Sequence, residues 1–115
     1  MKRGDIYAVD LDPALPGEAD KTRPCVIVSN NDRNDVTARH RRGIVTVVPL
    51  TTNTSRIYAF NVLVPGGKSG LRADSKAQAE QVRAVPFERI RARVGYVDAG
   101  LMTQLEAALR LHLSL

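Results

Sequence analysis

The chain has 115 residues, a formal net charge of +5 and 43% hydrophobic residues, which is typical of one globular domain spanning residues 1–115 and excludes a disordered chain. Its single cysteine, Cys25, excludes an intrachain disulfide and a cysteine-based zinc site. There is no signal peptide or long apolar run, so we expect a cytoplasmic protein that does not contact a membrane. The basic excess favours a polyanionic partner such as nucleic acid, although many small basic proteins bind none.

Two strands separated by a loop are predicted near the N-terminus. Residues 6–11 are rich in apolar and aromatic side chains and form the first strand, which Pro13 ends because proline cannot continue a hydrogen-bonded ladder. Residues 15–22 contain Pro, Gly and charged side chains, which indicates a loop. Arg23 and Pro24 precede an apolar, β-branched run at 25–29, which predicts a strand buried on both faces.

The middle of the chain predicts two further strands. Residues 30–34 are typical of a turn, and the polar and basic residues 35–42 fit either a loop or a short helix. Residues 44–50 form the strongest predicted strand of the chain, and the polar stretch 51–55 lies at its end. Residues 58–64 alternate apolar and polar side chains and predict another strand.

The C-terminal part predicts a turn, two strands and a helix. Residues 65–70 form the turn, and 75–81 favour a strand with a polar face, although their helix propensity is good. Residues 86–89 fit a short helical turn, and 92–97 a last strand. Asp98 is a plausible N-cap for a helix to about Leu113. One face of that helix carries residues at helical spacing, namely Leu101, Leu105, Ala108, Leu109 and His112. The predicted fold is an antiparallel, barrel-like sheet with a helical cover.

Several catalytic schemes do not fit this sequence. Neither Gly-rich nucleotide-binding fingerprint is present. His40 stands among arginines, in a pattern typical of a solvated basic loop, and His112 lies on or beside the apolar helix face, so a two-histidine ribonuclease is disfavoured. Asp5, Asp10 and Asp12 are spread along the first strand, which argues against a magnesium site built from converging carboxylates.

A different kind of site remains, because many polar residues fall in predicted loops or at strand ends: Glu18, Lys21, Arg23, Thr51, Thr52, Asn53, Ser75, Gln78, Glu80, Gln81 and Arg83. An arginine fork and a hydroxyl held together suit a phosphodiester, because both donate hydrogen bonds to phosphate oxygens. From spacing alone we favour an ordinary interpretation, in which Arg23 is a salt-bridged strand-end residue and Thr51 and Thr52 form a turn.

The sequence resembles the MazF/PemK/Kid family of toxin endoribonucleases over nearly its whole length. The similarity opens with a basic residue, Gly, an acid and an apolar-aromatic pair. It continues through an Arg-Pro-hydrophobic signature and a Pro-x-Thr-Thr block. The matching segments keep the family's order: KRGDIY at 2–7, DLDP at 10–13, RPCVIVSN at 23–30, VPLTT at 48–52, then LRADS at 71–75 with AEQVR at 79–83. No single segment is diagnostic, but together they outweigh the ordinary interpretation.

The resemblance implies a mostly β fold with helices (α+β), an SH3-like antiparallel barrel with a C-terminal helix, that forms a homodimer and cleaves single-stranded RNA. It implies Arg23 and Thr51 as the catalytic pair, with Glu18 as a third member. It also implies attack by the RNA 2′-hydroxyl, giving a 2′,3′-cyclic phosphate and a 5′-hydroxyl end without metal or cofactor. We expect RNA contacts from other loop residues: Lys21, Thr52, Asn53, Ser75, Gln78, Gln81 and Arg83.

The resemblance further implies a cognate antitoxin, whose acidic tail would compete with RNA for the basic surface. Two alternatives carry different functions. One is a toxin of the same fold that poisons DNA gyrase, but those relatives end in Trp-Gly-Ile, and this chain has no tryptophan. The other is a non-catalytic regulator that binds nucleic acid through the same basic loops.

Overall fold

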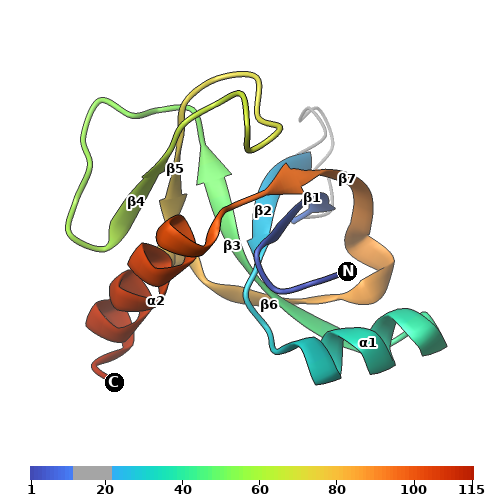
Figure 1. The fold of residues 1–115 in the computed structure, drawn as a ribbon. Coiled ribbons are helices and arrows are strands. Elements are labelled where there is room, and N and C mark those ends of the chain that lie inside the picture. Colours follow the sequence, from blue (N-terminus) through green and yellow to red (C-terminus); the bar gives the residue numbers. More distant parts are fainter. Residues whose placement is uncertain (12–21) are drawn as a thin grey trace, which may run out of the picture.

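The computed structural model describes residues 1–11 and 22–115, and its strands form an antiparallel sheet that helices flank (Figure 1). In chain order the elements are β1 (Asp5–Asp10), β2 (Thr22–Ile27), α1 (Asn31–His40), β3 (Ile44–Thr51), β4 (Asn61–Val64), β5 (Ser75–Gln78), η1 (Ala79–Gln81), β6 (Arg83–Pro86), η2 (Phe87–Arg89), β7 (Ile90–Tyr96) and α2 (Ala99–Leu113). The predicted strand-rich fold with a C-terminal helix is confirmed. None of the helices in the described part of the chain is long and apolar enough to cross a membrane.

The sheet has seven strands in the order β4-β5-β3-β2-β1-β7, with β6 also paired to β3. Strand β3 pairs with two strands along one edge: its residues 44–47 pair with β6, and its residues 50–51 pair with β5. The 3-10 turn η1 separates those two partners, so the strand predicted at 75–81 ends at Gln78. Among the described residues the sheet path is not closed, because β4 and β7 lie at its two ends. The sheet differs in this detail from a closed barrel, while its antiparallel pairing is as predicted.

Both faces of the central strands are buried. Val26 packs in one apolar cluster with Val48, Leu50 and the inner face of α2. Cys25 belongs to a second cluster, formed with side chains of β1, β3 and β6. This confirms the prediction from the apolar run at 25–29, because neighbouring strand residues point to opposite faces. Burying an aliphatic side chain fully contributes about 1.5–3 kcal/mol, so this double burial fixes β2 and β3 firmly.

Helix α1 corrects the prediction for residues 30–34, which are helical from Asn31 rather than a turn. Asn30 is the N-cap, and its Oδ1 accepts a hydrogen bond of 2.9 Å from the backbone N–H of Arg33. Asn34 is buried, and its side chain donates to the Ser29 carbonyl at 2.8 Å and accepts from the Ser29 hydroxyl at 2.6 Å. Residues typical of turns are also typical helix caps, which explains the error.

Helix α2 begins where the sequence predicts. The Asp98 side chain accepts a hydrogen bond of 2.9 Å from the backbone N–H of Leu101, as an N-cap does. Its buried residues are Met102, Leu105 and Ala108. Helical spacing puts His112 on the apolar face of α2 or at its edge. It is exposed, because the buried residues of this face end at Ala108, about one turn earlier.

Candidate functional site

The proposed catalytic residues lie where β2 and β3 approach the same end of the sheet. Strand β2 begins earlier than predicted, so Arg23 and Pro24 lie inside it, paired with Val9 and Ala8 of β1. The pairing of β2 with β3 starts only at Cys25, so at Pro24 the strand pairs with β1 alone. Thr51 is the last residue of β3, as predicted. Each side chain therefore lies at one end of a strand whose buried residues hold its backbone in place.

Strand register brings several predicted residues to one face. Arg23 is two residues from Cys25, which pairs with Pro49, and Thr51 is two residues beyond Pro49. Arg83 pairs with Val47 on the other edge of β3. Side chains two residues apart on a strand share a face, so Arg23, Thr51 and Arg83 point to the same side of the sheet.

Electrostatics at Cys25 agrees with this placement. Burial raises the pKa of the Cys25 thiol to about 12, while the positive charges of Arg83 and Arg23 oppose the rise. Both guanidinium groups therefore lie close to one buried side chain. Arg83 Nη2 also donates to the Leu11 carbonyl at 3.0 Å, which fixes its direction. Two positive charges on one face of the sheet favour the binding of a phosphate group there.

The Thr51 hydroxyl is oriented by the loop that follows it. The backbone N–H of Asn53 donates to Thr51 Oγ1 at 3.3 Å, so the hydroxyl proton remains available to donate elsewhere. Asn53 Oδ1 accepts from the Ser55 hydroxyl at 2.8 Å. Lys76 Nζ donates to the Arg56 carbonyl at 2.7 Å and lies 5.6 Å from the centre of the Tyr58 ring. These contacts hold the loop, and with it the hydroxyl, in a fixed position.

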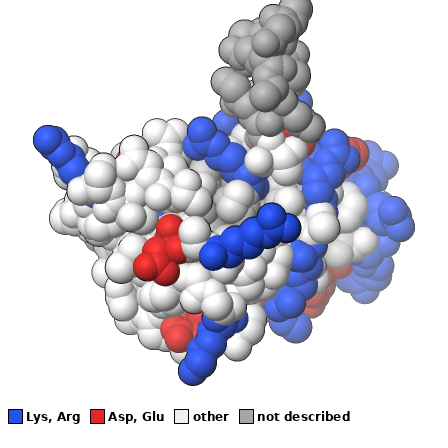
Figure 2. All heavy atoms as spheres, turned by 90° about the horizontal axis from the view of Figure 1, so that it is seen from above, with Lys and Arg blue, Asp and Glu red and all other residues white. Residues whose placement is uncertain are grey.

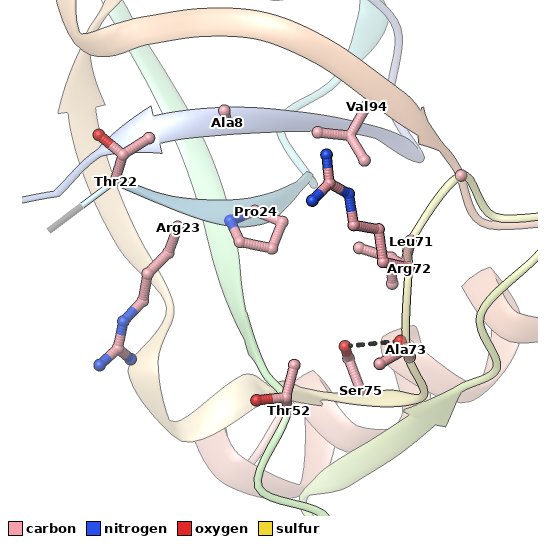
Figure 3. Close-up of a pocket in the computed structure, with 11 residues that line it drawn as sticks. Ala8, Thr22, Arg23, Pro24, Thr52, Leu71, Arg72, Ala73, Ser75 and Val94 are labelled. Atoms are coloured by element: carbon pink, nitrogen blue, oxygen red, sulfur yellow. Dashed lines mark hydrogen bonds between the residues drawn. The ribbon is translucent and has the colours of Figure 1, made fainter.

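Two adjoining hollows meet at this end of the sheet. The smaller, about 270 Å³, contains both residues of the expected catalytic pair, and we therefore name it the catalytic hollow. It is lined by Arg23, Pro24, Leu50, Thr51, Thr52 and Ser75. The larger, about 440 Å³, is the side hollow, which shares four of these residues and extends toward Leu71, Arg72 and Val94. In Figure 3 the Arg23 side chain extends away from Pro24, and the Arg72 guanidinium lies between Pro24 and Val94. Within residues 1–11 and 22–115, Arg23 has no ion-pair partner, which weakens its ordinary interpretation as a salt-bridged residue.

The other predicted site residues are placed less uniformly. Thr52 and Ser75 line both hollows, whereas Gln81 lies exposed in η1. The Oε1 atom of Gln78 is buried without a hydrogen-bond partner in the described part of the chain, which is unusual for a buried polar atom. Glu18 and Lys21 lie outside the described residues.

Arg72 lines the side hollow, although no sequence pattern indicates a role for it. The turn cluster at 65–70 indicates a loop, but no local pattern indicates which strand that loop contacts. The loop lies against β7 at two glycines: a Cβ on Gly70 would lie 2.2 Å from the Val94 carbonyl oxygen, and one on Gly95 would lie 1.8 Å from the Ser69 carbonyl oxygen. Only glycine permits this approach, which places Arg72 beside Pro24.

Charge is distributed unevenly around the site. Seen from the end that carries the hollows, Lys and Arg gather on the side of α1 and the β6–β7 turn, at the right of Figure 2, while the opposite side is mostly uncharged. Within residues 1–11 and 22–115, no group of three His, Cys, Asp or Glu side chains is arranged to hold a metal ion. The metal-free mechanism remains a prediction.

Comparisons with known proteins agree with this geometry. Residues 2–113 match the family described as PemK-like, MazF-like toxin of type II toxin-antitoxin system. "Endoribonuclease MazF9" of Mycobacterium tuberculosis is 48% identical over 115 residues, which is all of this chain and 98% of that protein. An "Endoribonuclease in complex with its cognate antitoxin from Mycobacterial species" has a TM-score of 0.77 and 29% identity, with 100% of this chain and 96% of that chain covered. A MazE-MazF structure from Deinococcus radiodurans, at TM-score 0.80 and 20% identity over 100% of this chain and 96% of that chain, supports the fold.

Proposed function

The chain belongs to the PemK-like, MazF-like toxins of type II toxin-antitoxin systems, and we propose that it cleaves single-stranded RNA with Arg23 and Thr51 as its catalytic pair, without a metal. It is an endoribonuclease, like its 48% identical relative. The observation that carries the assignment of the pair is that both residues line the catalytic hollow, at the ends of two buried strands. The proposed catalytic domain spans residues 1–115, and we propose that it acts in the cytoplasm on single-stranded RNA, either messenger RNA or ribosomal or transfer RNA.

The chemistry follows from the groups present. The 2′-oxygen of the RNA forms a bond to the adjacent phosphorus as the bond from phosphorus to the 5′-oxygen breaks. The products are a 2′,3′-cyclic phosphate and a 5′-hydroxyl end. The 2′-hydroxyl loses its proton, and the leaving 5′-oxygen gains one. Arg23 holds the non-bridging oxygens, and the Thr51 proton is donated as negative charge grows on them. Because the nucleophile belongs to the RNA, DNA is not cut.

Further contacts to RNA are proposed around this pair. Arg83 supplies a second positive charge on the same face, and the half-buried side chain of Gln78 is proposed as a further contact to RNA. The remaining proposed contacts come from strand ends and neighbouring loops: Lys21, Thr52, Asn53, Ser75 and Gln81. Glu18, implied by the family resemblance, is proposed as a third catalytic residue.

Two protein partners are proposed. A related mycobacterial endoribonuclease was solved with its cognate antitoxin, and an acidic antitoxin tail suits the basic side of this molecule. A homodimer is proposed because large apolar side chains are exposed on the edge strand β4 and near the end of α2: Leu63, Leu111, Leu113 and Leu115. Light scattering after gel filtration should give twice the chain mass, and a monomer mass at all concentrations would contradict the dimer.

The proposed reaction is tested on the products. Purified protein is incubated with a long single-stranded RNA in EDTA, and the ends of the fragments are analysed. We expect cuts at short defined sequences, 5′-hydroxyl ends that a kinase can label directly, and 2′,3′-cyclic phosphates. Cleavage that needs added magnesium, or 5′-phosphate ends, would contradict the metal-free mechanism. RNA binding without cleavage under all conditions would favour a non-catalytic regulator instead.

A further inference from the structure

The side hollow has the size of a ligand site. At about 440 Å³ it falls within the range of roughly 300–1,000 Å³ that is usual for small-molecule pockets, whereas the catalytic hollow does not. Its walls are mainly apolar, with Pro24 and Val94 on the strands and Leu71 on the loop. Its polar lining residues include Thr52, Arg72 and Ser75, and a few polar groups in a mainly apolar pocket can fix the orientation of a flat, partly polar ligand.

The loop that carries Arg72 forms a rigid wall. The Gly66 N–H donates to Asp74 Oδ1 at 2.9 Å, and the Ser69 hydroxyl donates to the Pro65 carbonyl at 2.8 Å. The Tyr96 N–H donates to the Ser69 carbonyl at 3.0 Å and ties the loop to β7. The wall is therefore in place before any ligand binds.

The Arg72 side chain is exposed at this rim, and within residues 1–11 and 22–115 it has no ion-pair partner. The nearest carboxylate in the sequence, Asp74, is used in the loop itself. In Figure 3, Pro24, Arg72, Leu71, Ser75 and Thr52 surround a central opening. Because arginine stacks on π-faces, the Arg72 side chain can cover one face of an aromatic base in this opening, with Pro24 as an apolar contact on its other side.

Resting on the proposed function, we propose that the side hollow binds one unstacked base of the RNA, next to the cleaved phosphate, between Pro24 and Arg72. The two hollows share Arg23, Pro24, Thr52 and Ser75, so the base and the phosphate belong to neighbouring positions of one strand. Ser75 Oγ donates to the Ala73 carbonyl at 3.2 Å and keeps its lone pairs for an amino group on the base edge. Arg72 is thus assigned as a specificity-determining residue.

The test uses short RNA oligonucleotides with a mapped cut site, in which each flanking base is replaced in turn by an abasic residue. For the wild type, removal of the bound base should lower kcat/KM by roughly 5- to 150-fold, the range given by stacking of one base on a protein side chain. We call this fold decrease in kcat/KM the abasic penalty. Arg72→Ala should reduce the penalty several-fold at this one position of the RNA only. Ala8→Leu, which fills the hollow from β1, should shrink the same penalty.

The matched control is Arg39→Ala, an exposed arginine on α1 that lines neither hollow, and it should keep every penalty at the wild-type value. Wild-type penalties at all positions in both Arg72→Ala and Ala8→Leu would overturn the inference. Binding of the same oligonucleotides with a 2′-deoxy residue at the cut site separates the two proposals. Base-dependent binding that Arg72→Ala removes supports the base site even if cleavage fails, whereas binding that ignores the flanking bases overturns it.

Discussion

The catalytic hollow and the side hollow share a rim, but different structures hold them in place. Arg23 and Thr51 lie at the ends of strands whose central residues are buried on both faces, so the catalytic hollow depends on the central core. The outer wall of the side hollow is the loop 65–74, which is placed by the contact of Gly70 and Gly95 between distant segments. We therefore expect that a change in the catalytic hollow lowers the cleavage rate and leaves base selectivity unchanged. A change in the loop 65–74 should instead alter base selectivity.

The largest expected effect is in the catalytic hollow. Thr51→Ala removes one hydrogen bond to the developing charge and should lower kcat by about 10²–10³-fold. Arg23→Ala should lower kcat at least as much and also raise KM, because it removes the phosphate clamp. Single-turnover rates in EDTA measure both, and unchanged circular dichroism melting curves exclude unfolding. Activity within a few-fold of the wild type in either variant would contradict the assignment.

Two glycine-to-alanine substitutions compare the tight contact behind the side hollow with a position where an added methyl group has space. Gly95→Ala places a methyl group against the Ser69 carbonyl and should destabilise the fold by about 1–3 kcal/mol. It should also loosen base selectivity. Gly100→Ala, in α2, has only the Asp98 side chain at 3.5 Å and should stabilise the fold by about 0.5–1 kcal/mol. Chemical denaturation measures both, and equal effects of the two substitutions would contradict the tight contact.

The buried thiol beside the catalytic hollow gives a pH dependence. Cys25 has a pKa of about 12 in the folded chain against 9.0 for a free thiol, so the unfolded chain loses this proton first as pH rises. Its contribution to stability is complete below pH 9 and declines by about 1.4 kcal/mol per pH unit above it. The wild type should therefore lose stability faster than Cys25→Ala between pH 9 and 10. Parallel curves would show that the thiol titrates normally.

The smallest expected effect on activity comes from a substitution in the N-cap of α2. It tests whether the two hollows keep their structure when this helix is destabilised. Asp98→Ala removes the N-cap of α2 and should cost about 1 kcal/mol of stability. Cleavage rate and base selectivity should stay at wild-type values at temperatures below the transition, as measured with the oligonucleotides described above. Asp98→Asn, which can still cap the helix, is the matched control. A changed base preference in Asp98→Ala would show that α2 supports the side hollow.

The sequence predicts best those elements whose structure is determined by residues close together in the chain. The strand at 25–27 was predictable because consecutive apolar β-branched residues have few stable alternatives to double burial. Thr51 was predictable because it ends such a strand. The start of α1 was missed because Asn30 and its polar neighbours suit a turn as well as a helix cap.

The side hollow was not predictable, because it arises from segments far apart in the sequence. Thr52 and Ser75 were selected as polar residues near strand ends, but nothing local indicated that they face a hollow shared with Ala8 and Val94. Arg72 lies in the segment 71–75 that resembles the family, but no local pattern indicates a role for it. Its position depends on Gly70 meeting Gly95, a contact that neither segment encodes alone.

The central claim is that the RNA supplies its own nucleophile, with Arg23 as phosphate clamp and participant in proton transfer and Thr51 as a hydrogen-bond donor to the transition state. The most direct measurement compares two oligonucleotides in EDTA that differ by one atom, the 2′-oxygen at the mapped cut site. The account predicts that the 2′-deoxy oligonucleotide binds with a similar Kd and is not cut there, while the all-RNA oligonucleotide is cut completely. Cleavage of the 2′-deoxy bond at a comparable rate would contradict it.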